Sequence, residues 1–363
     1  MIRGFDPTAA LLALAITSLT LWLLEPVAGR LNLLDHPAGR KDHEHPTPVT
    51  GGLAILVGCL VAFLFVQTSS QSLQAFCVAA VLLVAVGLYD DLHDLRWYWR
   101  VLAQSASALI IIFWGGVQVE QIGPVFGLSE LSLGWLSVPF TVFATIGIVN
   151  AMNMIDGADG LAGLLGLAAL VMLCAASIYA GNELLAMRLS VLCGALLGFL
   201  IWNIRLPWRP RAKVFLGNAG SALLGLVIAW VSFRLTQNDG HPVNPVLALW
   251  LLPVPVVDCL VLIVRRLQEG RSPFSAGRDH IHHIMQDAGF GPTRAAVWLT
   301  IFSLSCGLLV GQAMRLDVPN PLLLAAFLLL CAGWYLLTRN RERAVAFFRA
   351  LRRAPRLDPE GLL

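Results

Sequence analysis

The sequence predicts an all-α polytopic integral membrane protein, and three observations support this fold class. The chain has 363 residues, of which 57% are hydrophobic and only 13% charged, and its mean hydropathy is +0.74. It contains about eleven apolar runs close to the roughly 20 residues that an α-helix needs to cross a bilayer. Its basic residues gather in alternate loops between these runs. This composition excludes a soluble globular protein.

The apolar runs predict the positions of the membrane spans. The first run lacks the basic segment of a cleavable signal peptide and is therefore expected to be a span. All seven cysteines lie inside apolar runs without CxxC spacing, which predicts buried hydrophobic residues rather than disulfides or a zinc site. The expected spans are 7–25, 48–67, 74–90, 99–118, 132–150, 160–180, 184–203, 214–234, 243–264, 295–313 and 320–338.

The distribution of charge predicts which side of the membrane each loop faces. The loops after the first, third, fifth, seventh and ninth spans, with the C-terminal tail, hold 21 of the 25 Lys and Arg and seven of the eight His. By the positive-inside rule this side is cytoplasmic, so the N-terminus is periplasmic and the C-terminus cytoplasmic. We therefore expect one transmembrane catalytic domain and a basic tail on the anionic inner leaflet. The domain covers 1–338, with active-site loops at 26–47, 90–98, 150–160, 204–213 and 265–294, and the tail covers 339–363.

The segment Asn150–Leu161 is the first of four polar motifs at cytoplasmic span ends. Asn150, Asn153 and Asp156 are three residues apart, so a helical end places them on one face. The glycines that follow allow a sharp turn or a close approach to a ligand. Oxygen-bearing side chains with glycines suit a hard cation and a phosphate. The alternative is a polar helix cap followed by a turn.

A second motif, Asp90-Asp91-Leu-His-Asp94, closes the third span. Three carboxylates within five residues repel one another unless a cation or a basic partner neutralises them. Arg96 and Arg100 follow closely and can pair with these acids or with a phosphate. The alternative is an ordinary solvated helix end.

The third motif, Gly217-Asn218-Ala-Gly-Ser221, opens the eighth span. Small residues at a helix N-terminus expose backbone N–H groups that can bind an anion. Asn218 supplies a neutral oxygen where a hard metal ion prefers a carboxylate. The alternative is that the glycines only allow tight helix packing.

The fourth motif, Arg278-Asp-His280-Ile-His282-His283, follows the ninth span. Three His and an Arg can bind phosphate oxygens or pair with carboxylates. A zinc site is the rival hypothesis, but the motif lacks a companion Cys or an HExxH pattern. A surface loop without function is the other alternative. With acids and amides for a metal and Arg and His for phosphate, the four motifs together indicate a phosphoryl-transfer site.

From about Asp35 to His283 these motifs resemble the polyprenyl-phosphate N-acetylhexosamine-1-phosphate transferases of the WecA/MraY type. The resemblance rests on Asp-Asp-x-x-Asp at 90–94, Asn-x-x-Asn-x-x-Asp-Gly-x-Asp-Gly-Leu at 150–161, Gly-x-Ala-Gly-Ser at 217–221 and His-Ile-His-His at 280–283. The last of these, with Ser-Pro-Phe-Ser at 272–275, is closer to the WecA branch.

The resemblance implies that sugar-1-phosphate passes from a UDP-N-acetylhexosamine, expected to be UDP-GlcNAc, to undecaprenyl phosphate. The products are a lipid-linked pyrophosphoryl sugar and UMP, which start O-antigen or related cell-envelope polysaccharides. It further implies Mg²⁺ or Mn²⁺ as cofactor, the bacterial inner membrane as location, a homodimer, and no nucleic-acid partner.

The resemblance also implies a role for each motif residue. The catalytic acids are Asp90, Asp91, Asp94, Asp156 and Asp159, of which the first two position or deprotonate the lipid phosphate. The substrate-binding residues are Arg100, Asn150, Arg278, His280, His282 and His283, with Arg278 and Asp279 supporting the histidine loop. The metal-site residues are Asn153, Asp156 and Asn218.

One residue departs from the family pattern, which has Gly-Asp-x-Gly-Ser where this chain has Asn218. An amide can still offer a carbonyl oxygen to Mg²⁺, but it lacks the charge that makes binding strong. A catalytically impaired homologue that binds substrate without efficient turnover is therefore one alternative. A lipid or solute transporter is another, although the ionisable residues lie at span ends rather than at mid-span.

Overall fold

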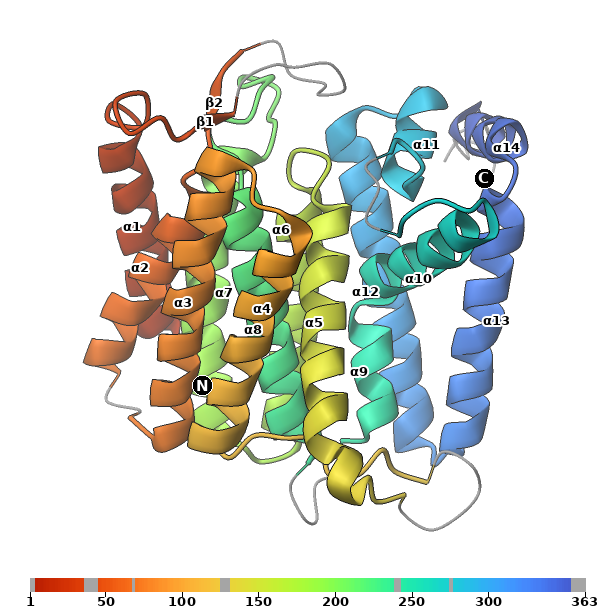
Figure 1. The fold of residues 1–363 in the computed structure, drawn as a ribbon, viewed down its shortest axis with the longest axis horizontal. Helices are drawn as coiled ribbons and strands as arrows, with labels where there is room; N and C mark the ends of the chain where they lie inside the picture. The colour runs from red at the N-terminus through yellow and green to blue at the C-terminus, as the bar shows by residue number, and fades with distance from the viewer. Residues whose placement is uncertain are drawn as a thin grey trace, which may run out of the picture.

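The computed structural model describes residues 4–35, 45–66, 69–124, 131–237, 243–273 and 277–353. Most of its helices run along one direction and form a bundle, with α1 beginning at the lower end and α14 lying at the upper end (Figure 1). In the first part of the chain the helices are α1 (Pro7–Leu24), α2 (Gly51–Phe65), α3 (Gln71–His93), α4 (Trp97–Leu109), the π-helix η1 (Ile110–Trp114), the 3₁₀-helix η2 (Gly134–Leu136) and α5 (Ser137–Ile155). The others are α6 (Leu161–Tyr179), α7 (Glu183–Asn203), α8 (Gly217–Thr236), α9 (Pro245–Leu251), α10 (Pro253–Gln268), α11 (Ile281–Asp287), α12 (Pro292–Arg315), α13 (Asn320–Thr338) and α14 (Arg341–Arg353).

These helices confirm the all-α polytopic fold. In the described residues, eight helices are long and apolar enough to cross a membrane, or nine with the bent pair α9 and α10. Strand structure in the described part is limited to a small antiparallel pair at the upper end, β1 (Leu34–Asp35) and β2 (Thr47–Pro48). Leu34 lies opposite Pro48 and Asp35 opposite Thr47.

The ninth expected span is not one straight helix. The axes of α9 and α10 differ by 86° at a break beside Leu252, and α10 crosses the bundle almost horizontally (Figure 1). Two prolines, Pro253 and Pro255, open α10. Because proline cannot donate a backbone hydrogen bond and its ring clashes with the preceding turn, a continuous helix is disfavoured here. The break places the end of α10 near the upper end of the bundle.

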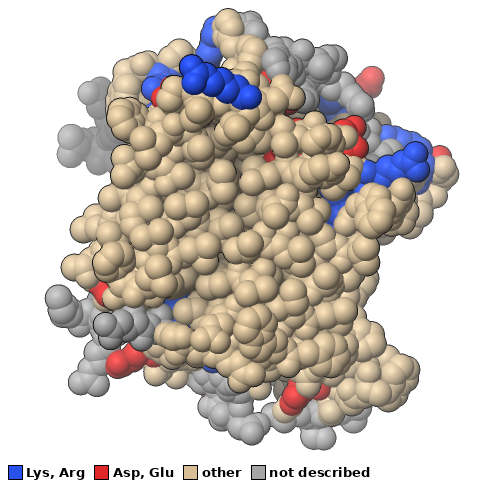
Figure 2. All heavy atoms as spheres, turned by 60° about the vertical axis from the view of Figure 1, so that its left-hand side comes forward, with Lys and Arg blue, Asp and Glu red and all other residues tan. Residues whose placement is uncertain are grey.

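Burial separates inner from outer helices. In α8, 89% of the 18-residue apolar stretch is buried inside the protein. In α1, α12 and α13 only 22% of the corresponding stretch is buried. The outer helices expose large apolar side chains such as Trp22, Leu309 and Leu329. Figure 2 shows a broad band without charged residues between the two ends of the molecule. This surface is what a lipid-facing exterior requires.

Glycines let α2 and α3 approach the start of α8 closely. A Cβ on Gly87 of α3 would lie 2.4 Å from Cα of Ala219. A Cβ on Gly52 of α2 would lie 2.3 Å from the backbone nitrogen of Gly220. Since both distances are shorter than any real Cβ contact, larger residues would push α8 away. The tight-packing interpretation of the Gly217–Ser221 motif is thereby supported.

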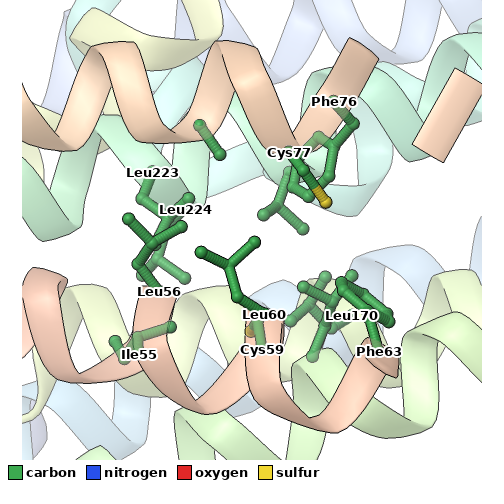
Figure 3. Close-up of a pocket in the computed structure, with 13 residues that line it drawn as sticks. Ile55, Leu56, Cys59, Leu60, Phe63, Phe76, Cys77, Leu170, Leu223 and Leu224 are labelled. Atoms are coloured by element: carbon green, nitrogen blue, oxygen red, sulfur yellow. The ribbon is translucent and has the colours of Figure 1, made fainter. Parts of the chain in front are cut away.

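A small apolar cavity lies among α2, α3, α6, α7 and α8 (Figure 3). Leucines and phenylalanines line it together with Cys59 and Cys77. Its volume of about 10 Å³ is at the lower limit for one water molecule, and its walls are apolar, so we regard it as a dry packing gap. All seven cysteines of the chain are unpaired and buried or half-buried, as the sequence predicts.

Candidate active site

An open cleft of about 910 Å³ occupies the upper end of the bundle. Its walls come from β1, the C-terminal ends of α3, α5 and α7, the start of α8, and α11 and α12. The loops that follow the first, third, fifth, seventh and ninth expected spans therefore meet at one place. Of the predicted site residues, those that line the cleft are Asp90, Asp91, Asp94, Asn153, Asp156, Asp159, Asn218 and His283.

The two neighbouring acids of α3 have different partners. Both oxygens of the buried Asp90 are engaged, because Oδ1 accepts a hydrogen bond from Leu95 N at 2.8 Å and Oδ2 lies 3.5 Å from Arg100 Nη1. Asp91 instead accepts hydrogen bonds from Asn218 N at 2.9 Å and from Ala219 N at 3.4 Å. Asp91 thus caps the N-terminus of α8, although it belongs to another helix.

This cap corrects one expectation from the sequence. The start of α8 was expected to offer free N–H groups to an anion, but two of those groups already bind the Asp91 carboxylate. Gly217 is at φ +74°, and a Cβ there would lie 2.7 Å from Asp91 Oδ2. The glycine is therefore required both by the backbone conformation and by the carboxylate beside it.

Asn153 and Asn218, the two amide residues of the predicted metal site, are hydrogen-bonded to each other. Asn153 Nδ2 donates to Asn218 Oδ1 at 2.8 Å and to Ser221 Oγ at 3.0 Å. A smaller cavity adjoins the cleft at this point and shares Asp90, Asn153 and Asn218 with it. Arg100 and Asn150 line this smaller cavity rather than the main cleft. The Asn150 amide donates there to Gln104 Oε1 at 2.9 Å.

Unlike Asp90, Asp91 and Asp159, the Asp156 side chain accepts no hydrogen bond from any residue in the described part of the chain. It is half-buried and lies at the C-cap of α5. Burial, with the nearby carboxylates of Asp91 and Asp159, raises the pKa of Asp156 to about 7. A half-buried carboxylate without a hydrogen-bond donor is what a cation would stabilise.

Asp159 connects the loop after α5 with the loop after α7, together with Asn203 and Arg205, which were not predicted from the sequence. Arg205 Nε lies 2.5 Å from Asp159 Oδ2. Asn203 accepts from Gly160 N and donates to Val214 O, both at 2.8 Å. The segment after α5 and the segment after α7 are thereby joined. Arg and Asn near span ends carry no distinctive spacing, so only these contacts identify them.

The histidine motif is divided between the cleft and the interior. His283 lines the cleft with Gln286, and its Nδ1 lies 3.4 Å from Gln286 Oε1. His282 is 1% exposed, and neither of its ring nitrogens has a hydrogen-bond partner among the described residues. Burial and the nearby cationic groups hold the pKa of His282 well below its usual range, so its ring is neutral.

The two other predicted substrate-binding residues of this motif lie outside the cleft lining. His280 is buried, with Nδ1 2.8 Å from Oδ2 of Asp258 on α10. Arg278 lies near the surface, 3.9 Å from Asp287, and its carbonyl accepts a hydrogen bond from Arg341 of α14. Their direct contact with substrate stays a prediction.

The donor atoms of the cleft fit a hard cation such as Mg²⁺. Asp156 supplies an uncompensated carboxylate, and Asn153 and Asn218 supply amide groups beside it. Nowhere in the described part of the chain do three or more His, Cys or acidic side chains form a metal-binding group. A cation here would therefore share its coordination with substrate phosphates and water, as Mg²⁺ commonly does.

A substitution at Gly157 tests how closely α11, which carries His282 and His283, packs against the Asn150–Leu161 segment. A Cβ at Gly157 would lie 2.3 Å from His282 Nε2. We expect Gly157→Ala to displace α11 and to lower the catalytic efficiency by about tenfold or more. Gly147→Ala is the matched control, because a Cβ at that helical position meets nothing within 4 Å. Equal effects of the two substitutions on steady-state transfer rates would contradict the packing argument.

Two further residues that line the cleft, Asp35 and Phe215, were not assigned a role from the sequence. Asp35 enters it from β1, and Phe215 precedes α8. Asp35 does stand beside a histidine and a proline in the first cytoplasmic loop, which is a signal that could have found it. Residues 36–44 of that loop lie outside the described residues.

The chain is similar in sequence to known proteins. Residues 73–236 match the sequence model of the family described as Glycosyl transferase family 4. The chain is 35% identical to the undecaprenyl-phosphate alpha-N-acetylglucosaminyl 1-phosphate transferase of Haemophilus influenzae, over 79% of this chain and 81% of that one. The proteins of the same name from Yersinia pestis and Escherichia coli K12 are 32% and 31% identical, and each match covers more than 90% of both chains. The chain therefore belongs to glycosyl transferase family 4, together with these sugar-1-phosphate transferases.

Proposed function

We propose that this protein transfers GlcNAc-1-phosphate from UDP-GlcNAc to undecaprenyl phosphate, with release of UMP. The observation that carries the proposal is the uncompensated carboxylate of Asp156 in a cleft that all four sequence motifs help to build. The names of the relatives supply the substrate class. The product would start an O-antigen or a related cell-envelope polysaccharide.

The proposal includes an orientation in the bacterial inner membrane. The cleft lies at the end of the bundle that carries most of the basic residues, and this end would face the cytoplasm. Eleven spans would result if α2, the α4–η1 pair and the bent α9–α10 pair each cross the bilayer. The N-terminus would then be periplasmic and α14 cytoplasmic. One catalytic domain over residues 1–338 and a homodimer also stay predictions.

The residues of the cleft support a direct attack of the lipid phosphate on the β-phosphorus of the nucleotide. A phosphate monoester is already largely ionised near neutral pH, so the protein mainly has to position it. Arg100, held by Asp90, is suited to binding this phosphate at the smaller cavity. His283 and Gln286 of α11 line the main cleft and present donors for the diphosphate. Phe215 offers a flat ring on which uracil can stack.

Asn153, Asp156 and Asn218 would hold the divalent cation. When bound, Mg²⁺ or Mn²⁺ supplies positive charge that stabilises the UMP leaving group. Asp91 contributes by capping α8, which fixes the backbone of Asn218. Asp159 contributes by its ion pair with Arg205, which fixes the loop that carries Asp156.

The proposal is tested with purified protein, UDP-GlcNAc labelled in the sugar, undecaprenyl phosphate and Mg²⁺ in detergent. We expect label in the extracted lipid and an equal amount of released UMP. Binding of UDP-GlcNAc without transfer would instead support an impaired homologue with Asn218 as its cause. Movement of label across a liposome membrane without UMP release would support a transporter. A panel of UDP-sugars then determines the specificity.

A further inference from the structure

The carboxylate of Asp258 joins three helices away from the cleft. Asp258 lies on α10 and is 2% exposed. Its Oδ1 accepts hydrogen bonds from Ile281 N at 3.2 Å and from Trp334 Nε1 of α13 at 3.1 Å. Its Oδ2 lies 2.8 Å from His280 Nδ1. Buried carboxylates are retained only where donors satisfy them, and here every donor comes from α13 or from the start of α11.

These contacts determine the orientation of the His280 ring. The carboxylate of Asp258 already acts as an acceptor toward Ile281 N and Trp334 Nε1, so we assign the proton of the third contact to the Nδ1 atom of His280. The other ring nitrogen, Nε2, does not face Asp258, because Nδ1 occupies that side of the ring. The position of the ring is thus set by Asp258, and the first residue of α11 is set by the same group.

From His280 a row of three imidazole rings leads to the cleft. We call His280, His282 and His283 the histidine stack. The ring centroids of the first two are 5.6 Å apart with an interplanar angle of 19°, and those of the second pair are 4.1 Å apart. His282 packs against Gly157, and His283 lines the cleft. The stack therefore connects Asp258 with both the Asp156 loop and the cleft wall.

We infer that Asp258 is a positioning residue, which acts through the Nδ1 proton of His280 to seat the histidine stack so that His283 faces the substrate. In this role His280 holds the stack in place, and His283 is the member that contacts the diphosphate. The inference rests on the proposed function, since it assumes a nucleotide diphosphate in the cleft. It assigns to Asp258 and His280 an indirect effect on nucleotide binding.

Asp258→Asn separates this role from a purely structural one. The amide oxygen can still accept from Ile281 N and Trp334 Nε1, so the three helices stay joined. The amide NH₂ then faces His280 Nδ1, which has to give up its proton. We expect the Kd and KM for UDP-GlcNAc to rise about tenfold while kcat changes by less than about threefold. The melting temperature in detergent should stay within about 3 °C of the parent value.

Two substitutions of His280 identify which ring nitrogen matters. His280→Asn places an amide nitrogen near the position of Nδ1 and can still donate to Asp258. His280→Gln places its amide nitrogen near the position of Nε2 and cannot. We expect His280→Asn to keep its Kd within about threefold of the parent and His280→Gln to weaken binding as Asp258→Asn does. The opposite order would show that Nε2 contacts the substrate and would overturn the inference.

The control is Glu269→Gln, the same chemical change on an exposed carboxylate at the end of α10 that pairs with Arg271. An unchanged Kd in Asp258→Asn would overturn the inference, and transfer by the parent would still support the proposed function. If the parent binds UDP-GlcNAc without transferring sugar and Asp258→Asn weakens binding, the inference holds and the proposed function fails. If the parent does not bind UDP-GlcNAc, both are overturned.

Discussion

Asp156→Asn should reduce sugar-phosphate transfer at least about 100-fold and should raise the thermal stability of the metal-free protein. Transfer falls because the substitution removes the uncompensated carboxylate that the proposed cation needs. Stability rises because the ionised side chain is half-buried and repelled by Asp91 and Asp159. A loss of function that comes with a gain in stability is the mark of a residue kept for its chemistry.

The pH dependence of this stability gain has a definite sign. Folding raises the pKa of Asp156 to about 7 from the ordinary aspartate value of 3.8. The unfolded chain therefore releases this proton at lower pH than the folded chain does, and stability falls as the pH rises between these two values. We expect the gain in melting temperature from Asp156→Asn to be largest near pH 8 and small near pH 4 when EDTA is present.

Melting curves in detergent and transfer rates measure both effects. Asp317→Asn makes the same chemical change at an exposed site beyond the far end of α12 and serves as control. A variant with normal transfer, or one that is less stable at pH 8 without metal, would show that Asp156 is satisfied within the protein itself.

Asn218→Asp should lower the Mg²⁺ concentration for half-maximal transfer at least about tenfold, because a carboxylate binds Mg²⁺ more strongly than an amide does. The hydrogen bond from Asn153 Nδ2 to the side chain at position 218 can be kept, since either oxygen of Asp can accept it. The added charge would lie close to Asp91 and Asp156, so the metal-free variant should melt at a lower temperature. Bound Mg²⁺ should reverse this loss.

The measurement is UMP release over a Mg²⁺ titration, with melting curves in EDTA and in Mg²⁺. Asn182→Asp is a suitable control, because Asn182 caps α7 at the lower end of the bundle and its side chain accepts from Leu185 N at 3.1 Å. Equal transfer rates of parent and Asn218→Asp at limiting Mg²⁺ would show that the amide at this position does not weaken the metal site.

Much of the site could be predicted from the sequence because its motifs are local. Asp90 with Asp91, and Asn153 with Asp156, are neighbours along the chain, and each pair follows an apolar run. Hydropathy and charge then place the loops that carry them on one side of a membrane. The structure brings eight of the predicted residues to one cleft, so this part of the prediction needed no knowledge of helix packing.

The sequence could not show which polar groups are already bound. Asp91 and Asn218 are 127 positions apart, and no local pattern states that one caps the helix of the other. The three histidines look equivalent in sequence, yet His282 is enclosed against Gly157 and His283 faces the cleft. The bend beside Leu252 was also missed, because hydropathy averages over a window and the two prolines lie inside an apolar run.

By itself the sequence determined the all-α membrane class and the four polar motifs, since both depend on composition and spacing over a few turns of helix. The tertiary structure decided the role of each group within those motifs. Asp91 is satisfied by α8, Asp159 by Arg205 and His280 by Asp258, whereas Asp156 accepts no hydrogen bond from the described residues. The physical reason is that the charge a buried group can carry depends on its partners, and here these partners come from distant parts of the chain.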